Sequence, residues 1–322
     1  MLRGDFAAAW NISDRILQRR ARAGERTHEL PRHWQWLWDG RALTGARVLV
    51  HCYHGLGDTI QFVRLLPRLH ERCATVALWA QPALLDLLRD APGIDRLVAL
   101  HDGAPGIARD CDVELMELPH ILRLVPDEIP ARVPYLGSQF PRAGRDPRQP
   151  PRIGLCWRAG DWNAARSVPE SALAPLARLR GVQWFSLQYP ALPTPFPMRN
   201  LACRDLRVFA QRLCSLDLVI SVDTLSAHLA GALGLPTWTL LPADCDWRWM
   251  RARADSPWYP TMRLIRQPQV GGWENVIGQV ASMLKIHAWA FPRERAAGEP
   301  AKALDSRLRG NDKSRATAEY SA

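Results

Sequence analysis

The sequence predicts an α/β protein in which two Rossmann-like domains with parallel sheets face each other across a cleft. Strand-like apolar runs alternate with helical stretches from residue 47 to about 140, and the alternation resumes at 152. Strands that alternate with helices form parallel sheets covered on both faces. Between the two series, a segment rich in Pro, Gly and Arg predicts a linker at 141–151. The chain has 322 residues, which suits two domains of ordinary size.

The composition excludes several classes of protein. We find no apolar run of about 18 residues, so we expect no membrane span, and the first residues lack the apolar stretch of a signal peptide. The 7 cysteines are scattered without a CxxC pair, which favours reduced thiols in a cytoplasm and no structural zinc site. The net charge of +10 is carried almost wholly by arginine, without a nucleic-acid motif. We therefore expect anionic ligands or peripheral contact with an anionic inner-membrane surface, and no nucleic acid.

Residues 1–46 are expected to form an N-terminal helical arm. The stretch 4–23 has apolar residues at helical spacing, and its opening GDFAAAW resembles the second helix of a tetratricopeptide repeat. Trp34, Trp36 and Trp38 follow at alternate positions. We interpret them as a hydrophobic flap packed on the first domain, with a sugar-stacking platform as the alternative.

The first domain is expected at 47–140. Its apolar runs predict strands at 47–52, 75–80, 96–101 and 112–116, separated by helical stretches at 58–72 and 82–91.

The first strand is followed by a glycine turn and the acid Asp58, at the end of the strand where open α/β sheets bind ligands. Gly55 and Gly57 allow close approach of the backbone, and the helix expected from Asp58 presents free N–H groups. Asp58 has two interpretations. It is a general base, or it caps its own helix through a D-x-x-Q capping box with Gln61.

The second domain is expected at 152–292, and the polar residues 293–322 are expected to be a disordered tail. Its pattern predicts strands at 152–158, 182–188, 217–223, 236–241 and 262–267, and helices at 171–180, 209–216, 224–234 and 273–287.

The run 217–236 carries the second polar constellation. Asp223 is placed as the N-cap of the helix that follows, with Thr224 and His228 on one face and Ser226 in the first turn. Hydroxyls and free N–H groups at a helix start suit a diphosphate. The alternative is a plain capped helix with a buried histidine.

Six segments occur in an order that resembles family 9 of the glycosyltransferases, the ADP-heptose:lipopolysaccharide heptosyltransferase group. They are HGLGDTIQF (54–62), IGLCWRAG (153–160), RSVP (166–169), SLQ (186–188), SVDTLSAHLAGALGLPTW (221–238) and DWRWM with SPWYPTMRLIRQP (246–268). The likeness covers about residues 47–286 and is greatest to the branch often fused behind tetratricopeptide repeats.

The resemblance implies a GT-B fold and an inverting, metal-independent transfer from a nucleotide-sugar. Asp58 would be the general base, Asp223, Thr224 and His228 would hold the diphosphate and sugar, and Arg166 would face the phosphates. The expected nucleotide-sugar site comprises Gly55, Gly57, Trp157, Arg158, Arg166, Gln188, Asp223, Thr224, Leu225, Ser226 and His228. The expected acceptor side or cleft wall comprises His54, Gln61, Asp246 and Trp247.

No cofactor or metal is expected beyond the nucleotide-sugar substrate. Asp244 and Asp246 form a D-x-D, the spacing by which other glycosyltransferases hold Mg²⁺ or Mn²⁺, but three letters are weak evidence and they fall in the DWRW segment. The prediction is a cytoplasmic glycosyltransferase that moves a sugar, such as heptose, to a hydroxyl of a glycan, glycolipid or protein. Two alternatives remain. One is a non-catalytic nucleotide-sugar-binding module, and the other is a nucleotide-dependent oxidoreductase, disfavoured because the glycine turn lacks the third glycine of GxGxxG.

Overall fold

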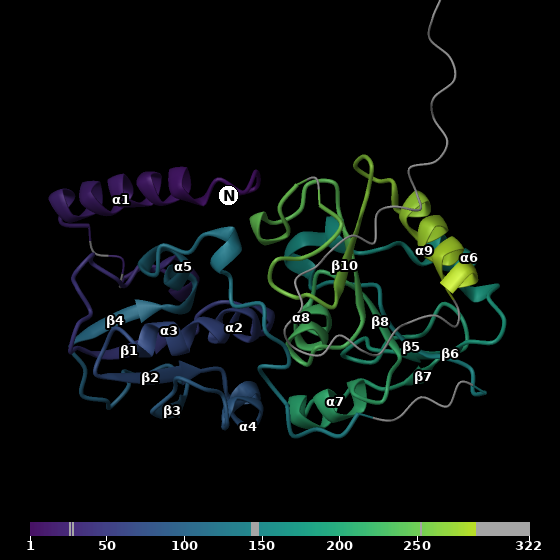
Figure 1. Ribbon diagram of the computed structural model, residues 1–322, viewed down its shortest axis with the longest axis horizontal. Helices are drawn as coiled ribbons and strands as arrows, with labels where there is room; N and C mark the ends of the chain where they lie inside the picture. Colours follow the sequence, from purple (N-terminus) through teal and green to yellow (C-terminus); the bar gives the residue numbers. More distant parts are fainter. Residues whose placement is uncertain (26, 28, 143–147, 252, 288–322) are drawn as a thin grey trace, which may run out of the picture. The chain divides into compact units, whose positions relative to one another are not determined.

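The computed structural model (Figure 1) describes residues 1–25, 27, 29–142, 148–251 and 253–287. Two sheets dominate it, and every strand pair in both sheets is parallel. The α/β class with two parallel sheets is therefore confirmed. The central part of the expected linker and the whole of the expected tail lie outside the described residues, and the domain boundaries stay a prediction.

The first sheet has four strands in the order β3-β2-β1-β4. They are β1 (Arg47–His51), β2 (Thr75–Ala80), β3 (Arg96–Ala99) and β4 (Cys111–Glu114). Its helices are α2 (Leu56–Phe62), α3 (Leu66–His70), α4 (Leu85–Leu88) and α5 (Leu118–Ile121). Each strand lies within a stretch predicted from the apolar runs or starts one residue before it. The mostly buried strands β1, β2 and β4 were recognisable because buried parallel strands read as nearly continuous apolar segments.

The second sheet has six strands in the order β10-β9-β8-β5-β6-β7. They are β5 (Arg152–Cys156), β6 (Gln183–Ser186), β7 (Arg199–Asn200), β8 (Leu218–Val222), β9 (Thr237–Leu241) and β10 (Met262–Arg266). Its helices are α6 (Ala174–Ala177), α7 (Leu206–Leu213), α8 (Leu225–Ala232) and α9 (Trp273–His287). The two-residue edge strand β7 was not predicted, because both of its residues are polar and exposed.

Short 3-10 helices connect or extend these elements. They are η1 (Arg32–Trp34), η2 (Val63–Leu65), η3 (Pro82–Leu84), η4 (Leu115–Glu117), η5 (Pro126–Glu128), η6 (Asp161–Arg166), η7 (Glu170–Leu173) and η8 (Trp247–Trp249).

The N-terminal arm contains the predicted helix, α1 (Phe6–Ala23), which runs alongside α5 in Figure 1. The indole N–H of Trp10 anchors it by donating to the carbonyl of Leu124 at 2.7 Å. The tryptophan segment after it is only partly the expected packed flap. Trp38 packs against the core and edge-on against the ring of His120, whereas Trp34 and Trp36 are 61% and 39% exposed. The segment is also attached through its backbone, as described below.

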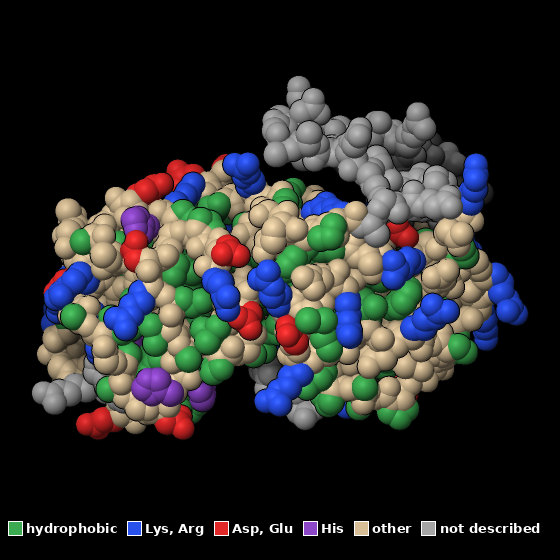
Figure 2. Space-filling view, turned by 90° about the horizontal axis from the view of Figure 1, so that it is seen from below, with side chains coloured by type: hydrophobic (Ala, Val, Ile, Leu, Met, Phe, Trp, Pro, Cys, Tyr) green, Lys and Arg blue, Asp and Glu red, His purple; other side chains and the backbone are tan. Residues whose placement is uncertain are grey.

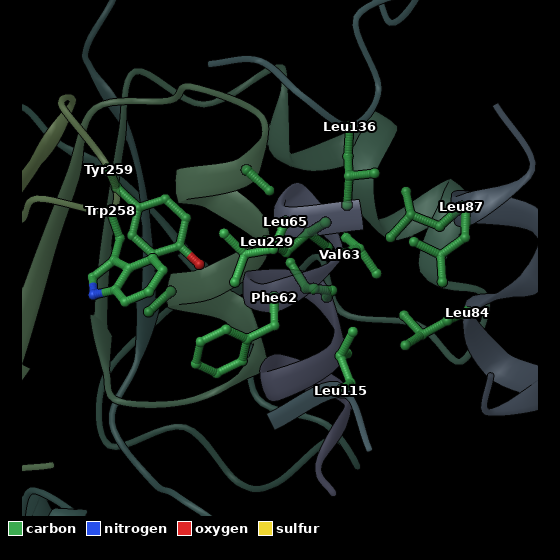
Figure 3. Close-up of a cluster of buried hydrophobic side chains, with 14 of the residues drawn as sticks. Phe62, Val63, Leu65, Leu84, Leu87, Leu115, Leu136, Leu229, Trp258 and Tyr259 are labelled. Atoms are coloured by element: carbon green, nitrogen blue, oxygen red, sulfur yellow. The ribbon is translucent and has the colours of Figure 1, made fainter. Parts of the chain in front are cut away.

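The hydrophobic core is continuous between the two sheets. Figure 3 shows Phe62 and Leu65, from α2 and η2, lying beside Leu229 of α8 and the rings of Trp258 and Tyr259. All five side chains are buried. Helices α2 and α8, which each follow a central strand, therefore pack directly against each other.

Basic side chains are spread over the surface. On the face in Figure 2, the blue Lys and Arg side chains are scattered, and several lie near red acidic ones. In the described part of the chain, no helix has the length and apolarity needed to cross a membrane.

Candidate active site

The glycine turn after β1 places Asp58 in the first turn of α2, and two details differ from expectation. The helix begins at Leu56 rather than at Asp58, with Gly55 as its N-cap. The predicted D-x-x-Q box is therefore wrong, because Asp58 is the third helical residue and Gln61 lies fully buried one turn later. Asp58 still has a capping role, since its Oδ2 accepts the N–H of Gly55 at 2.9 Å.

The other oxygen of Asp58 is held by Arg248, a residue of η8 that sequence reasoning missed. The Nη1 of Arg248 donates to Oδ1 of Asp58. Its Nε donates to Oδ1 of Asp246 at 2.9 Å, so one guanidinium joins both acids. The Arg248 side chain is only 14% exposed. The signal was present, because this arginine lies between two tryptophans in the DWRW segment that carried part of the family resemblance.

Arg248 also lowers the pKa of the Asp58 carboxyl. Burial alone would raise the pKa of the Asp58 carboxyl, but the charge and hydrogen bond of Arg248, the charge of His228 and the N–H of Gly55 outweigh it. The pKa of Asp58 is therefore below its ordinary value. Asp58 is a carboxylate at neutral pH, and in this arrangement it is paired rather than free.

A second buried acid, Glu114 at the end of β4, lies behind the turn. One of its oxygens is 3.7 Å from Nε2 of His54, the predicted acceptor-side residue. It also accepts the N–H of Tyr53 at 3.2 Å. Burial raises the pKa of Glu114 to about 8, with the charge of Asp58 contributing in the same direction. From the sequence pattern, Glu114 was predicted only as part of a strand.

The second constellation begins where β8 ends, and here too one detail is corrected. The N-cap of α8 is Thr224, and the Asp223 side chain does not cap it. Instead, the Asp223 carboxylate lies 3.3 Å from Nε2 of His228 and 3.7 Å from Nη1 of Arg166. Burial opposes the charged form of Asp223, but His228 and Arg248 outweigh it and hold its pKa at about 2.

His228 and Arg166 are each fixed by a further contact. The Nδ1 of His228 lies 2.9 Å from the hydroxyl of Tyr259. The Nη1 of Arg166 donates to the backbone carbonyl of Asp223 at 3.0 Å. These contacts orient both side chains towards one buried carboxylate at the start of α8.

The remaining predicted residues of the second sheet lie at neighbouring strand ends. The hydroxyl of Thr224 is 3.0 Å from that of Ser221. Oε1 of Gln188 accepts the backbone N–H of Arg158 at 3.2 Å, so the loops after β5 and β6 are tied together. Of the other predicted residues, Trp157 and Ser226 are buried. The side chain of Arg158 is exposed.

The starts of α2 and α8 meet, which joins the two constellations. A Cβ atom on Gly57 would lie 2.9 Å from Cδ2 of His228 and 3.6 Å from Cα of Leu225. Glycine at 57 thus permits the contact between the helices. Trp247, predicted as a cleft wall, packs edge-on against Phe6 of α1 and stacks on Phe62 of α2.

The geometry of the D-x-D pair is unlike that of a metal site. Asp246 caps η8 and pairs with Arg248, while the exposed Asp244 lies 3.7 Å from Arg251. Within residues 1–142, 148–251 and 253–287, excluding 26 and 28, no group of three or more His, Cys, Asp or Glu is placed to hold a metal ion.

No model of a known protein family matches the sequence. Protein FlbA from Caulobacter vibrioides is 27% identical over 299 residues, which cover 78% of this chain and 48% of that protein. The chain thus spans about half the length of this curated relative.

Among solved structures, the glycosyltransferase family 9 protein from Veillonella parvula DSM 2008 superposes with a TM-score of 0.53 at 11% identity, covering 77% of this chain and 98% of that one. TibC from enterotoxigenic Escherichia coli, described as a dodecameric iron-containing heptosyltransferase in complex with ADP-D-β-D-heptose, superposes with a TM-score of 0.50 at 14% identity. That match covers 76% of this chain and 78% of TibC. The chain therefore has the GT-B fold of these family 9 glycosyltransferases.

Proposed function

We propose that this protein is an inverting glycosyltransferase that moves a sugar from a nucleoside-diphosphate sugar to a hydroxyl group. The observation that carries the proposal is the meeting of two sites at one helix pair. A carboxylate, Asp58, lies at the start of α2, and the start of α8 combines buried His228 with Asp223, which Arg166 of η6 approaches.

The transfer combines a displacement at the anomeric carbon, a general base for the acceptor and stabilisation of the leaving group. The acceptor oxygen forms a bond to the anomeric carbon while the bond from that carbon to the diphosphate breaks. The acceptor proton passes to Asp58, which is the general base. The departing diphosphate takes up the electron pair and is stabilised by the N–H groups of α8 and by Arg166.

The donor is expected to hold its diphosphate near Thr224, Leu225 and Ser226. Heptose is a candidate sugar, since TibC is described as bound to ADP-heptose. The acceptor is a glycan, glycolipid or protein, and peripheral contact with a membrane would suit a lipid-linked acceptor. The residues supply their charge without a metal, so we also propose metal-independent transfer, for which retention of turnover in EDTA is the test.

Asp58→Asn tests the catalytic role. Asparagine keeps an oxygen that can accept the N–H of Gly55 but removes the base, so turnover should fall by about 100-fold or more. Nucleotide-sugars are first screened by thermal shift, and release of nucleoside diphosphate with candidate acceptors is then measured. Asp244→Asn, on an exposed acid of the same region, is the control and should retain activity. Undiminished turnover in Asp58→Asn would contradict the assignment.

One observation favours a second candidate, a non-catalytic nucleotide-sugar-binding module. Both oxygens of Asp58 are engaged, one by Gly55 and the other by Arg248. A module of this kind would be stabilised by a nucleotide-sugar yet release no nucleoside diphosphate with any acceptor. The same screen therefore separates the two functions.

A further inference from the structure

Arg248 is the cation at the junction of the two halves of the site. It contacts Asp58 and Asp246 directly, and the charge of Asp223 acts on it as well. Its guanidinium therefore contacts the proposed base and interacts electrostatically with Asp223 of the proposed diphosphate site. No role was assigned to it by the motifs that predicted the other residues.

We propose that Arg248 is a donor-operated latch, which masks Asp58 until a donor diphosphate draws the guanidinium away and leaves the carboxylate free. The inference rests on the proposed function, because it assigns an order to events at the same site. It makes Arg248 a positioning residue for Asp58, with the donor binding before the acceptor is deprotonated.

The backbone beneath Arg248 is held, so that movement would be confined to the side chain. The carboxylate of Asp246 accepts the backbone N–H of Arg248 at 3.0 Å. The indole N–H of Trp258 donates to the carbonyl of Arg248 at 3.0 Å. A long arginine side chain on a fixed backbone can exchange partners by rotation about its side-chain bonds.

A diphosphate can displace only one of the two hydrogen-bond partners of Asp58. The N–H of Gly55 belongs to the backbone of the turn and stays with Oδ2. The guanidinium at Oδ1 belongs to another element, and a diphosphate is the stronger competitor for it because it carries more negative charge and accepts paired hydrogen bonds. Release would therefore free one oxygen of Asp58 without loosening the turn.

Asp246 keeps the guanidinium satisfied while it changes partner. Its carboxylate already binds Nε of Arg248 at 2.9 Å and Nη2 at 3.4 Å, which leaves Nη1 to face Asp58 or a phosphate. The other titratable groups around Asp58 are His54, Glu114 and His228. Because these lie on or beside β1, β4 and α8 rather than η8, they remain in place when Arg248 moves.

The latch predicts proton uptake when a diphosphate binds. Losing Arg248 raises the pKa of Asp58, so the proton uptake on binding should be larger at about pH 5 than at about pH 7.5. Calorimetry of ADP, GDP, UDP and dTDP binding, in buffers of different ionisation enthalpy, measures this uptake. Subtracting the value for Asp58→Asn removes protons taken up by the nucleotide itself.

Three substitutions give the comparison. Arg248→Met leaves Asp58 already unmasked, so the uptake attributable to Asp58 should fall below that of the wild type and the diphosphate should bind about tenfold more weakly. Arg248→Lys retains a charge and should keep part of both effects. Arg251→Met, on an exposed arginine of the same loop, should change neither. Thermal melting checks that each variant is folded.

The possible failures are distinguishable. Diphosphate binding with equal proton uptake in the wild type and in Asp58→Asn would overturn the latch and leave the proposed transferase standing. Diphosphate binding that is equally tight in the wild type, Arg248→Met and Arg248→Lys would also overturn the latch and leave the proposed transferase standing. If none of the four nucleoside diphosphates binds, the donor site itself is wrong and the latch is wrong with it.

Discussion

Glu117 is a buried acid that ties the tryptophan segment to the end of the first sheet. Its carboxylate accepts the backbone N–H groups of Leu37 at 3.2 Å and Trp38 at 3.1 Å. It also accepts the N–H of Glu114 at 2.8 Å. One acid thus binds three N–H groups from two segments of backbone. Glu114 in turn holds the N–H of Tyr53, so the attachment extends to the turn that carries Asp58.

These two acids predict how stability depends on pH. Burial raises the pKa of Glu117 to about 7 and that of Glu114 to about 8, from an ordinary value of 4.5. Between the ordinary pKa of 4.5 and the raised pKa of each acid, the folded protein binds more protons than the unfolded chain. The free energy of unfolding therefore falls as pH rises through this range. The fall begins above about pH 4.5 and ends above about pH 8, at up to about 1.3 kcal/mol per pH unit for each acid.

Urea denaturation across this range measures the slope. Glu117→Gln should flatten it, because glutamine has no charge to bury. Glu128→Gln, on an exposed acid of η5, is the matched control and should leave the slope unchanged. An equally steep fall in Glu117→Gln would show that Glu117 is not responsible.

At this scale the sequence identified residues better than it identified their partners. Asp58, Asp223 and His228 were singled out because polar residues at strand ends are conspicuous. Arg248 and Glu117 were missed because their partners are distant in the sequence. Arg248 is 190 positions from Asp58, and Glu117 is 79 or 80 positions from the residues whose N–H groups it accepts. A local pattern contains no information about such a partner.

At the scale of elements, the start of α2 shows how a glycine sets the spacing between helices. The ring of His228 faces Gly57 and has little freedom, since it is bound to Tyr259 and stacked on Trp249 with centroids 5.3 Å apart. A side chain at 57 would therefore displace a helix rather than a loose ring.

Gly57→Ala should destabilise the protein although alanine is the better helix former. The added methyl group would be only 2.9 Å from the His228 ring, and overpacking of this kind costs about 1–3 kcal/mol. Gly278→Ala in α9 is the control, because nothing lies within 4 Å of its Cβ position and the helix should gain about 0.5–1 kcal/mol. Thermal unfolding of both variants measures the difference, and stabilisation by both would refute the close approach.

Element types were predictable, whereas their ends were less so. The helix after β1 begins two residues before Asp58, because glycine at 55 serves as N-cap without a side chain. The predicted helix 58–72 is divided into α2, η2 and α3, with Pro67 at the start of α3. Apolar periodicity does not register such changes in helix type.

At the scale of the whole molecule, the two sheets share one core that also contains a buried cation. Arg64 of η2 lies between the rings of Tyr135 and Tyr259, 4.1 Å and 4.8 Å from their centroids. Its Nη1 donates to the carbonyl of Trp258. The sequence predicted two units with a cleft between them, but it could not predict this contact, because an arginine within an apolar helix looks like an exposed position.

The shared core predicts that the described residues of both sheets unfold in one cooperative transition. Arg64→Ala should lower the stability of both together, by about 3 kcal/mol, because it leaves a cavity between two tyrosines and removes the hydrogen bond to Trp258. Arg68→Ala, on the more exposed surface of α3, should change stability by no more than about 0.5 kcal/mol. Urea unfolding followed by near-UV and far-UV circular dichroism measures both, since tryptophans lie in each half. Coincident curves that shift together in Arg64→Ala are expected, whereas two separate transitions in the wild type would show that the halves are stable independently.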